Sequence, residues 1–411
     1  MNGTRRMHRG QLLALLAWMM VTACGGGGGT SAPPASNPGG GSGGSGSGGG
    51  TGGGGGGTPP PPAGAPEIGG CAVFPADAIF NTAIDTLPVH PDNAAWMSLI
   101  TQAGARTVPL HPDWGNQDNS AQYDTYYGIP YNVVGAGAQS SDWPTVSFSV
   151  TDPRAGNGDG VPDESDCAVT NTAGGFDLVR NCASVAPAAR RFPYPADAGL
   201  KAEGGNCNDA QVCGDRHVLV VEQGSCRLWE SYFSYKLNGQ WYAYSTAAWD
   251  LRSNAMRPDT WTSGDAAGLP ILPLLARAGE ASAGEIRHAF RVTLRDSVLA
   301  RVATWPARHA AGGATAGGIP FGAAMRLRRD FAIPPDWTPQ AQRIAAAMQT
   351  YGLYVADIGS DLFVQGEPNA QWDALTIEQL KQLRVAQFEF VDLRPITTHP
   401  QFSADSFRAS W

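Results

Sequence analysis

Charged residues are scarce in this chain. They make up 16% of its 411 residues, whereas hydrophobic residues make up 42%. Disordered chains and coiled coils are rich in charge and poor in aromatic residues, so this composition excludes both classes. Basic residues are also in the minority, with 28 against 36 acidic ones, which gives a formal net charge of −8. A negative surface repels a phosphate backbone, and we therefore expect no nucleic acid among the partners.

The sequence patterns of several common chemistries are absent too. The only Gly-x-Ser-x-Gly match lies in a Gly/Ser-rich segment that cannot form a nucleophile elbow. There is no His-Glu-x-x-His zinc motif, no phosphate-binding loop and no dinucleotide fingerprint. Cys-x-x-Cys, the spacing of zinc and thioredoxin-like sites, does not occur either. These absences argue against a serine esterase, a zinc protease or an NTPase.

The N-terminus has the features of an export signal. Arg5, Arg6 and Arg9 precede the apolar run Leu12–Val21, which is too short to span a bilayer as a helix of about 20 residues. The run ends in Val-Thr-Ala-Cys24, which resembles the lipobox of bacterial lipoproteins. That resemblance implies a signal peptide over residues 1–23, cleavage before Cys24 and a lipid on its thiol. Gly25 at the next position fits sorting to the outer membrane, with the protein on its periplasmic face or at the cell surface.

Glycine is concentrated just after this signal. Of the 53 glycines, 20 lie between Gly25 and Thr58, together with serine and proline. Such a segment cannot pack a core and behaves as a flexible coil. We therefore expect residues 24–66 to form a tether, and the lipid on Cys24 to be the only contact with the membrane. A single large β-rich domain is expected over residues 67–411.

Six cysteines remain beyond Cys24, and an even number in an exported protein predicts disulfides. Six cysteines allow 15 pairings. Short loops favour Cys167–Cys182 and Cys207–Cys213, which leaves Cys71 to pair with Cys226.

Strand signals outnumber helix signals over the predicted domain. Short β-rich or alternating runs occur at residues 145–150, 217–221, 285–294, 353–358 and 388–391. Helices are predicted from Asp92 to Gly104, from Thr338 to Gly352, and over about Ile377–Leu383. We therefore expect a mainly β protein, a β-sandwich or jelly roll with a few peripheral helices.

The segment 214–232 predicts a β-hairpin that turns at Gln223-Gly224. Loops of two or four residues give one register, in which His217 lies opposite Glu230 and Asp215 opposite Tyr232. Because side chains alternate between faces, all four share one face, and opposed side chains lie about 5 Å apart. A carboxylate at that distance can tune an imidazole for proton transfer. The alternative is a structural ion pair in the core, which the leucines on the same face favour.

Three further residues can contribute to a site. His288 shares the even face of residues 285–294 with apolar residues, a pattern that is also typical of a core histidine. Asp357 shares a face with Leu353 and Val355, where a carboxylate needs a partner or a ligand. His309 follows Trp305 on a predicted loop and can approach a cleft.

An acidic segment, Asn157-Gly-Asp159-Gly-Val-Pro-Asp163-Glu-Ser-Asp166, resembles the calcium-binding repeats of thrombospondin. That resemblance implies a Ca²⁺ site with Asn157, Asp159, Asp163 and Asp166 as ligands. The alternative is an acidic loop stapled by Cys167. No other cofactor is expected.

Several longer segments resemble a family of uncharacterised secreted proteins of soil bacteria. They are Gly214-Asp-Arg-His-Val-Leu-Val-Val, Trp249-Asp-Leu-Arg-Ser-Asn-Ala-Met-Arg-Pro, Trp261-Thr-Ser-Gly-Asp-Ala-Ala-Gly-Leu-Pro-Ile, Ile286-Arg-His-Ala-Phe-Arg-Val-Thr and Tyr351-Gly-Leu-Tyr-Val-Ala-Asp-Ile-Gly-Ser. The resemblance covers most of residues 72–395 and implies no particular activity. In that family the acidic segment leads almost directly into a Pro-Tyr-Pro like that at 193–195. This makes residues 167–191 an insertion here and weakens the calcium interpretation.

Two functions follow as hypotheses. The first is a surface-anchored enzyme that acts on extracellular or cell-wall polysaccharide, a glycoside hydrolase or lyase that uses histidine and carboxylate groups. Its candidate catalytic residues are Asp215, His217, Glu230, His288 and Asp357, and its candidate substrate-binding residues are Arg216, Tyr232, Trp261 and His309. The second is a non-catalytic carbohydrate-binding or adhesion lipoprotein, in which the same hairpin is only structural.

Overall fold

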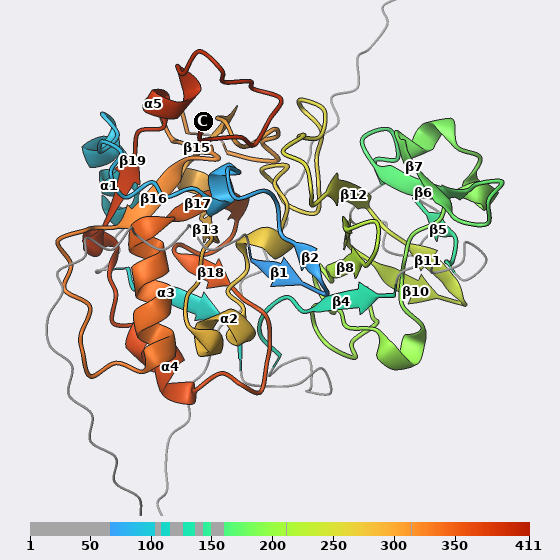
Figure 1. Cartoon of the computed structure of the whole chain (residues 1–411), viewed down its shortest axis with the longest axis horizontal. Helices are drawn as coiled ribbons and strands as arrows, with labels where there is room; N and C mark the ends of the chain where they lie inside the picture. Colours follow the sequence, from blue (N-terminus) through green and yellow to red (C-terminus); the bar gives the residue numbers. More distant parts are fainter. Residues whose placement is uncertain are drawn as a thin grey trace, which may run out of the picture. The chain divides into compact units, whose positions relative to one another are not determined.

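The computed structural model describes residues 66–102, 108–115, 126–135, 143–148, 160–210, 212–313 and 315–411 (Figure 1). Its contacts divide the chain after Pro60, and all described residues belong to the second unit, Pro61–Trp411. Strands dominate this unit and helices are few, so the prediction of a mainly β protein is confirmed. The predicted signal peptide, Cys24 and the tether up to residue 65 lie outside the described residues.

The largest sheet has six strands in the order β19-β16-β17-β13-β18-β3. Its strands are β3 (His111–Asp113), β13 (Phe290–Leu294), β16 (Ala324–Leu327), β17 (Leu353–Ile358), β18 (Phe363–Gln365) and β19 (Phe388–Val391). β13 pairs in parallel with β17, and β18 with β3, while the other pairs are antiparallel. Every residue of β13 is buried, including Arg291 and Thr293, which alternate with its three apolar residues.

A second sheet has four strands in the order β12-β9-β8-β4. These strands are β4 (Tyr131–Val134), β8 (Val218–Glu222), β9 (Arg227–Tyr232) and β12 (Ser245–Asp250). Each face of the sheet carries core residues. Leu219 and Val221 belong to a large core that also contains the interior of the six-stranded sheet, whereas Val218 and Val220 belong to a smaller core.

Smaller sheets complete the β structure. β5 (Val146–Ser147), β10 (Tyr235–Leu237) and β11 (Gln240–Tyr242) form a three-stranded sheet. The predicted insertion forms a hairpin of β6 (Asp166–Thr170) and β7 (Phe176–Arg180), and Cys167 and Cys182 join the smaller core. Two further pairs are β1 (Glu67–Ile68) with β2 (Cys71–Ala72), and β14 (Leu299–Ala303) with β15 (Ile319–Phe321).

The three predicted helices are present. α1 (Asn93–Gln102) matches the expected range, and α3 (Pro339–Thr350) begins after Thr338, whose hydroxyl accepts the backbone N–H of Ala341. α4 (Ala374–Leu380) begins three residues earlier than expected because Asp373 caps it by accepting the N–H of Leu375. α3 packs against α2 (Ala278–Ala283), α4 and β16 (Figure 1). The remaining α-helix among the described residues is α5 (Arg394–Thr397).

Short 3-10 turns connect many of these elements. They are η1 (Ile79–Asn81), η4 (Cys182–Ser184), η5 (Pro187–Ala189), η6 (Asp197–Gly199), η7 (Leu272–Leu274), η8 (Asp296–Val298) and η9 (Val385–Gln387).

The strand predictions are confirmed for β17 and β19, whose bounds agree with the sequence pattern. Only the second half of the predicted strand 285–294 forms, as β13, because the chain bends before Phe290. The predicted strand 145–150 is shorter in the structure, as β5, and residues 149 and 150 lie outside the described part. Sandwiches and jelly rolls are built from antiparallel sheets, whereas β4 pairs with β8 and β13 with β17 in parallel. The structure therefore establishes the mainly β class but not a sandwich or jelly roll.

β8 and β9 form the predicted hairpin, but the predicted register is wrong by two residues. Glu222 pairs with Arg227, so Leu219 rather than His217 lies opposite Glu230. Cys226 has a φ of +50° and lies in the turn, where it is bonded to Cys71. A shift by an even number of residues leaves every side chain on its predicted face.

Three disulfides join Cys71 to Cys226, Cys167 to Cys182 and Cys207 to Cys213, with Cα–Cα distances of 5.4, 5.6 and 5.8 Å. The predicted pairing is confirmed. Disulfides persist in oxidising compartments, so they indicate an oxidising, extracellular environment. Within the described ranges, we find no helix with the length and apolarity that a bilayer span requires.

Candidate functional site

A cavity of about 400 Å³ lies where the segment before β8 and the ends of β9 and β17 approach the loop after β12. This size is typical of small-molecule sites. Three carboxylates line it from three separate segments. Asp215 precedes β8, Asp265 lies in the loop after β12, and Asp357 lies near the end of β17. The other lining residues are Tyr232, Tyr244, Thr262, Ser263, Gly264, Ala266, Ala311 and Ile358.

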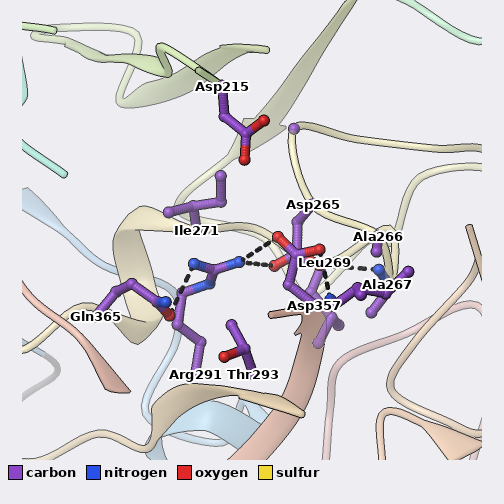
Figure 2. Close-up of polar contacts among 12 residues, drawn as sticks. Asp215, Asp265, Ala266, Ala267, Leu269, Ile271, Arg291, Thr293, Asp357 and Gln365 are labelled. Atoms are coloured by element: carbon purple, nitrogen blue, oxygen red, sulfur yellow. Dashed lines mark hydrogen bonds and ion pairs between the residues drawn. The ribbon is translucent and has the colours of Figure 1, made fainter. Parts of the chain in front are cut away.

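Arg291 of β13 joins two of these carboxylates (Figure 2). Its Nη2 lies 3.0 Å from Oδ2 of Asp265 and 3.1 Å from Oδ2 of Asp357, and its Nη1 donates to Oε1 of Gln365 at 2.9 Å. The two carboxylate oxygens are therefore no more than about 6 Å apart, because both contact the same nitrogen atom. A guanidinium that is 2% exposed requires such partners to compensate for its lost hydration.

A β-bulge brings Asp357 to this arginine. Val355 pairs with Val292, but Asp357 pairs with the next residue, Thr293, which leaves Ala356 as the extra residue. The expectation that Asp357 shares a face with Leu353 and Val355 is therefore wrong, because it assumed an unbroken strand. The requirement for a partner is met by Arg291.

Burial and the neighbouring charge of Asp357 raise the pKa of Asp265 to about 8, although Arg291 acts in the opposite direction. Asp265 is fully enclosed, whereas the side chain of Asp357 is 23% exposed. Two carboxylates that share one cation in a dry environment do not both ionise readily. Asp265 therefore retains a proton near neutral pH, and Asp357 is the member of the pair that solvent can reach.

Asp215 points its carboxylate toward this pair from the opposite side of the cavity (Figure 2). Its Oδ1 accepts a hydrogen bond from the hydroxyl of Tyr232 at 3.3 Å. The surrounding protein and the negative charges of Glu203 and Asp357 raise the pKa of Asp215, against the effect of His217 and of the Tyr232 hydroxyl. An exposed carboxyl group that retains its proton more strongly than usual is suited to act as a general acid.

His217 does not pair with Glu230, contrary to the prediction. Its Nδ1 lies 2.6 Å from Oε2 of Glu203, and its Nε2 lies 2.6 Å from the carbonyl oxygen of Gly264. Burial disfavours the imidazolium, but the charges of Glu203 and Asp215 outweigh it and raise the pKa of His217 to about 9. The ring is 3% exposed and lies behind the cavity wall, 5.3 Å from the ring of Tyr232.

Glu230 is completely buried, and its hydrogen-bond partners are backbone N–H groups. Its carboxylate accepts the N–H groups of Ile271 and Leu272 at 2.9 Å, at the start of η7. Burial raises the pKa of Glu230 to about 7, against the effect of these donors. His217 and Glu230 therefore do not form the predicted proton-transfer pair. Instead, His217 binds the carbonyl oxygen of Gly264, and Glu230 binds the backbone N–H groups of Ile271 and Leu272.

His288 is also enclosed by protein, with no exposed surface. Its Nε2 lies 2.8 Å from Oε2 of Glu280, and its Nδ1 lies 2.7 Å from the carbonyl oxygen of Ala289. Burial and the charge of Arg277 lower the pKa of His288, against the effect of Glu280. It is not among the residues that line the cavity.

The candidate substrate-binding residues lie at different distances from the cavity. Tyr232 lines it. His309 lies on a loop, as predicted, and its Nδ1 is 2.9 Å from the carbonyl oxygen of Ala266, a lining residue. Trp261 precedes the lining residue Thr262 but packs against the guanidinium of Arg257. Arg216 is 4% exposed and its Nη1 donates to the carbonyl oxygen of Gly205, so it does not line the cavity.

The acidic segment does not offer Asp166 to a cation. Oδ2 of Asp166 lies 2.6 Å from Nη1 of Arg180 and 2.8 Å from Nε of Arg257, and it also accepts the N–H of Ala248. Both guanidinium groups contact the same carboxylate oxygen, and Asp166 is completely buried, which argues against it as a Ca²⁺ ligand. Of the other proposed ligands, Asn157 and Asp159 lie outside the described residues. Across the described ranges, no cluster of three or more histidine, cysteine or acidic side chains is arranged to hold a metal.

Sequence reasoning missed Glu203, Asp265 and Arg291. Arg291 offered a signal, since it is the one charged residue in the buried run 290–294 and therefore needs acidic partners. Glu203 and Asp265 lie in loops, where no periodicity marks a residue as inward-facing.

Comparison of the chain with protein-family models, curated proteins and solved structures gave no match. The resemblance to secreted proteins of soil bacteria stays a prediction.

Proposed function

We propose that this protein is an exported glycoside hydrolase, anchored to the outer membrane through a lipid on Cys24, that acts on extracellular or cell-wall polysaccharide. The observation that supports it best is the cavity in which Asp215 faces the Arg291-bound Asp357. Hydrolysis of a glycosidic bond requires two carboxyl groups, one on each side of the scissile bond.

The two carboxyl groups have different environments, which suits them to different roles. Asp215 is exposed, and its raised pKa favours the protonated form that a general acid needs. Asp357 is held by Arg291, which supports a negative charge on it as the base or nucleophile. Asp265 and Arg291 are enclosed and orient Asp357. Tyr232 and Tyr244 line the same cavity and can stack on a sugar ring.

The charge of the cavity favours hydrolysis over the lyase alternative. A polysaccharide lyase removes the proton next to a uronate carboxylate, and its substrate is therefore anionic. Three carboxylates line this cavity, and its nearest guanidinium, that of Arg291, is already shared by two of them. The described residues that line the cavity include no arginine, lysine or histidine, so a uronate carboxylate would find no cation there, which favours a neutral chain.

The test is a panel of neutral, amino and uronate polysaccharides assayed for new reducing ends and for unsaturated products. We expect reducing ends from the wild type and a loss of kcat of about 10²- to 10⁴-fold in Asp215→Asn and Asp357→Asn. The matched control is Asp330→Asn, which alters a surface carboxylate that is 69% exposed beside Arg328.

Three results would overturn this proposal. Unsaturated products without hydrolysis would make the enzyme a lyase. Retention on insoluble glycans without turnover would favour the non-catalytic carbohydrate-binding alternative. Full activity of Asp215→Asn would remove that residue from the mechanism.

A further inference from the structure

The segment Ser263–Ala266 forms one wall of the cavity, and two histidines contact the backbone of this segment. Nε2 of His217 lies 2.6 Å from the carbonyl oxygen of Gly264, and Nδ1 of His309 lies 2.9 Å from that of Ala266. Between these two carbonyl groups lies Asp265, the carboxylate that shares Arg291 with Asp357. The position of Asp265 therefore depends on how firmly this short segment is held.

The contacts of His217 determine where its protons lie. A carbonyl oxygen can only accept, so Nε2 carries a hydrogen and donates it to Gly264. On the other side of the ring, Oε2 of Glu203 contacts Nδ1 at 2.6 Å and accepts the backbone N–H of the same histidine at 3.1 Å. His217 thus makes two contacts with the Glu203 carboxylate, and its ring links that carboxylate to the cavity wall.

The site leaves little room for the wall to move while this bridge is intact. A Cβ atom added at Gly264 would lie 3.2 Å from Cδ1 of Ile271 and 3.4 Å from Cδ2 of His217. The neighbouring carbonyl of Ser263 accepts the hydroxyl of Ser245 at 2.7 Å. Loss of the imidazole donor would leave a buried carbonyl without its partner, which favours rearrangement of the segment.

We propose that His217 is a positioning residue: by tying the carbonyl of Gly264 to Glu203, it holds Ser263–Asp265 in place and so sets Asp265 and, through Arg291, Asp357. It does not transfer a proton to substrate. The catalytic consequence rests on the proposed function, whereas the effect on the cavity wall does not.

The charged and titratable groups that face His217 are Glu203, Asp215, Glu230 and Tyr232. The nearest acids keep the ring protonated through neutral pH, and its pKa of about 9 marks where the bridge to Glu203 weakens. Above about pH 9 the ring loses its Nδ1 proton, because Nε2 still donates to Gly264, and the Nδ1 lone pair then faces Oε2 of Glu203 at 2.6 Å. This repulsion is expected to displace the ring and loosen the wall, which is held firmly at pH 7.

The first arm of the test is hydrogen exchange of the full chain, followed for peptides that cover residues 262–268. His217→Gln retains a donor at the Nε2 position, whereas His217→Asn places its amide at the Nδ1 position and loses the bond to Gly264. We expect exchange in this segment to rise at least about tenfold in His217→Asn and to return close to the wild-type rate in His217→Gln. Wild-type exchange in His217→Asn, or equally fast exchange in both variants, would overturn the proposal.

If His217→Asn does not fold, the pH dependence of hydrogen exchange in the wild type tests the proposal instead. After correction for intrinsic rates, exchange should accelerate between pH 8 and 10 in residues 262–268 more than elsewhere, and a uniform change would refute the proposal. The control is His399→Asn, which alters a histidine stacked on Trp411 at the C-terminus.

The second arm uses the polysaccharide that the wild type hydrolyses. A positioning role predicts that His217→Gln keeps most of kcat, while His217→Asn loses at least about tenfold with little change in KM. Equal losses in both variants would instead make His217 a proton-transfer residue. If no polysaccharide is hydrolysed, the proposed function fails, and the exchange measurements still decide the role of His217.

Discussion

Glu230 offers a direct test of how burial acts on a charge in this protein. Its side chain is completely enclosed, and its partners are the N–H groups of Ile271 and Leu272. An unfolded glutamate ionises with a pKa of 4.5, whereas burial raises the pKa of Glu230 to about 7. Between these values the folded state binds more protons than the unfolded state, so the free energy of unfolding falls as the pH rises.

The structure sets the size of this effect. The two pKa values correspond to about 3 kcal/mol, which is present below about pH 4.5 and lost by about pH 8. Glu230→Gln removes the titration but keeps the shape. One amide oxygen at the position of Oε1 can still accept both N–H groups, because Oε1 receives both in the wild type.

The measurement is urea denaturation of the wild type and Glu230→Gln from pH 4.5 to pH 8. Relative to the wild type, the variant should gain about 3 kcal/mol of stability across this range. The control is Glu378→Gln, which alters a glutamate that is 66% exposed, and should show a flat difference. A flat difference for Glu230→Gln would show that the buried group ionises normally, and loss of turnover without any change in stability would restore it as a catalytic candidate.

Three further predictions concern the core, the disulfides and the anchor. Arg291→Met leaves Asp265 buried without its cation and should lower the free energy of unfolding by about 3–5 kcal/mol; a loss below about 1 kcal/mol would contradict the buried pairing. Alanine at both Cys71 and Cys226 removes a bridge with a sequence separation of 155 and should cost about 4–5 kcal/mol in the same titration, so an unchanged urea midpoint would show that the bridge does not constrain the chain. Cys24→Ser should release the protein from detergent extracts of membranes, and unchanged partition would exclude the lipid anchor.

The hairpin shows what the alternation of side chains along a strand can predict: the face on which a residue lies, but not the strand register. A period of two assigns His217, Glu230 and Tyr232 to one face, and the observed register, shifted by two residues, keeps that assignment. The register itself depends on which residues form the turn. Cys226 turns with a positive φ and is bonded to Cys71, a residue far away in the sequence, and no local pattern reports that constraint.

The site could be predicted only in part, for a similar reason. Asp215 and Asp357 could be found because each accompanies a β-rich run, where a carboxylate is unusual. Asp265 and Glu203 could not be found in this way, because each belongs to the site only through a partner from another segment, Arg291 for Asp265 and His217 for Glu203. The bulge at Ala356 is a further obstacle, because a single extra residue reverses the face on which Asp357 lies.

The bridge between Cys71 and Cys226 also determines where the protein can bear a mechanical load. Pro66 is the first described residue, and Cys71 follows only five residues later. Tension on the chain ahead of Glu67 can separate β1 from β2, but it then meets a covalent bond to the turn between β8 and β9. Those two strands are the central pair of the four-stranded sheet. Tension applied from the N-terminal side would therefore pass through the disulfide to the middle of this sheet, next to the segments that carry Asp215 and Tyr232.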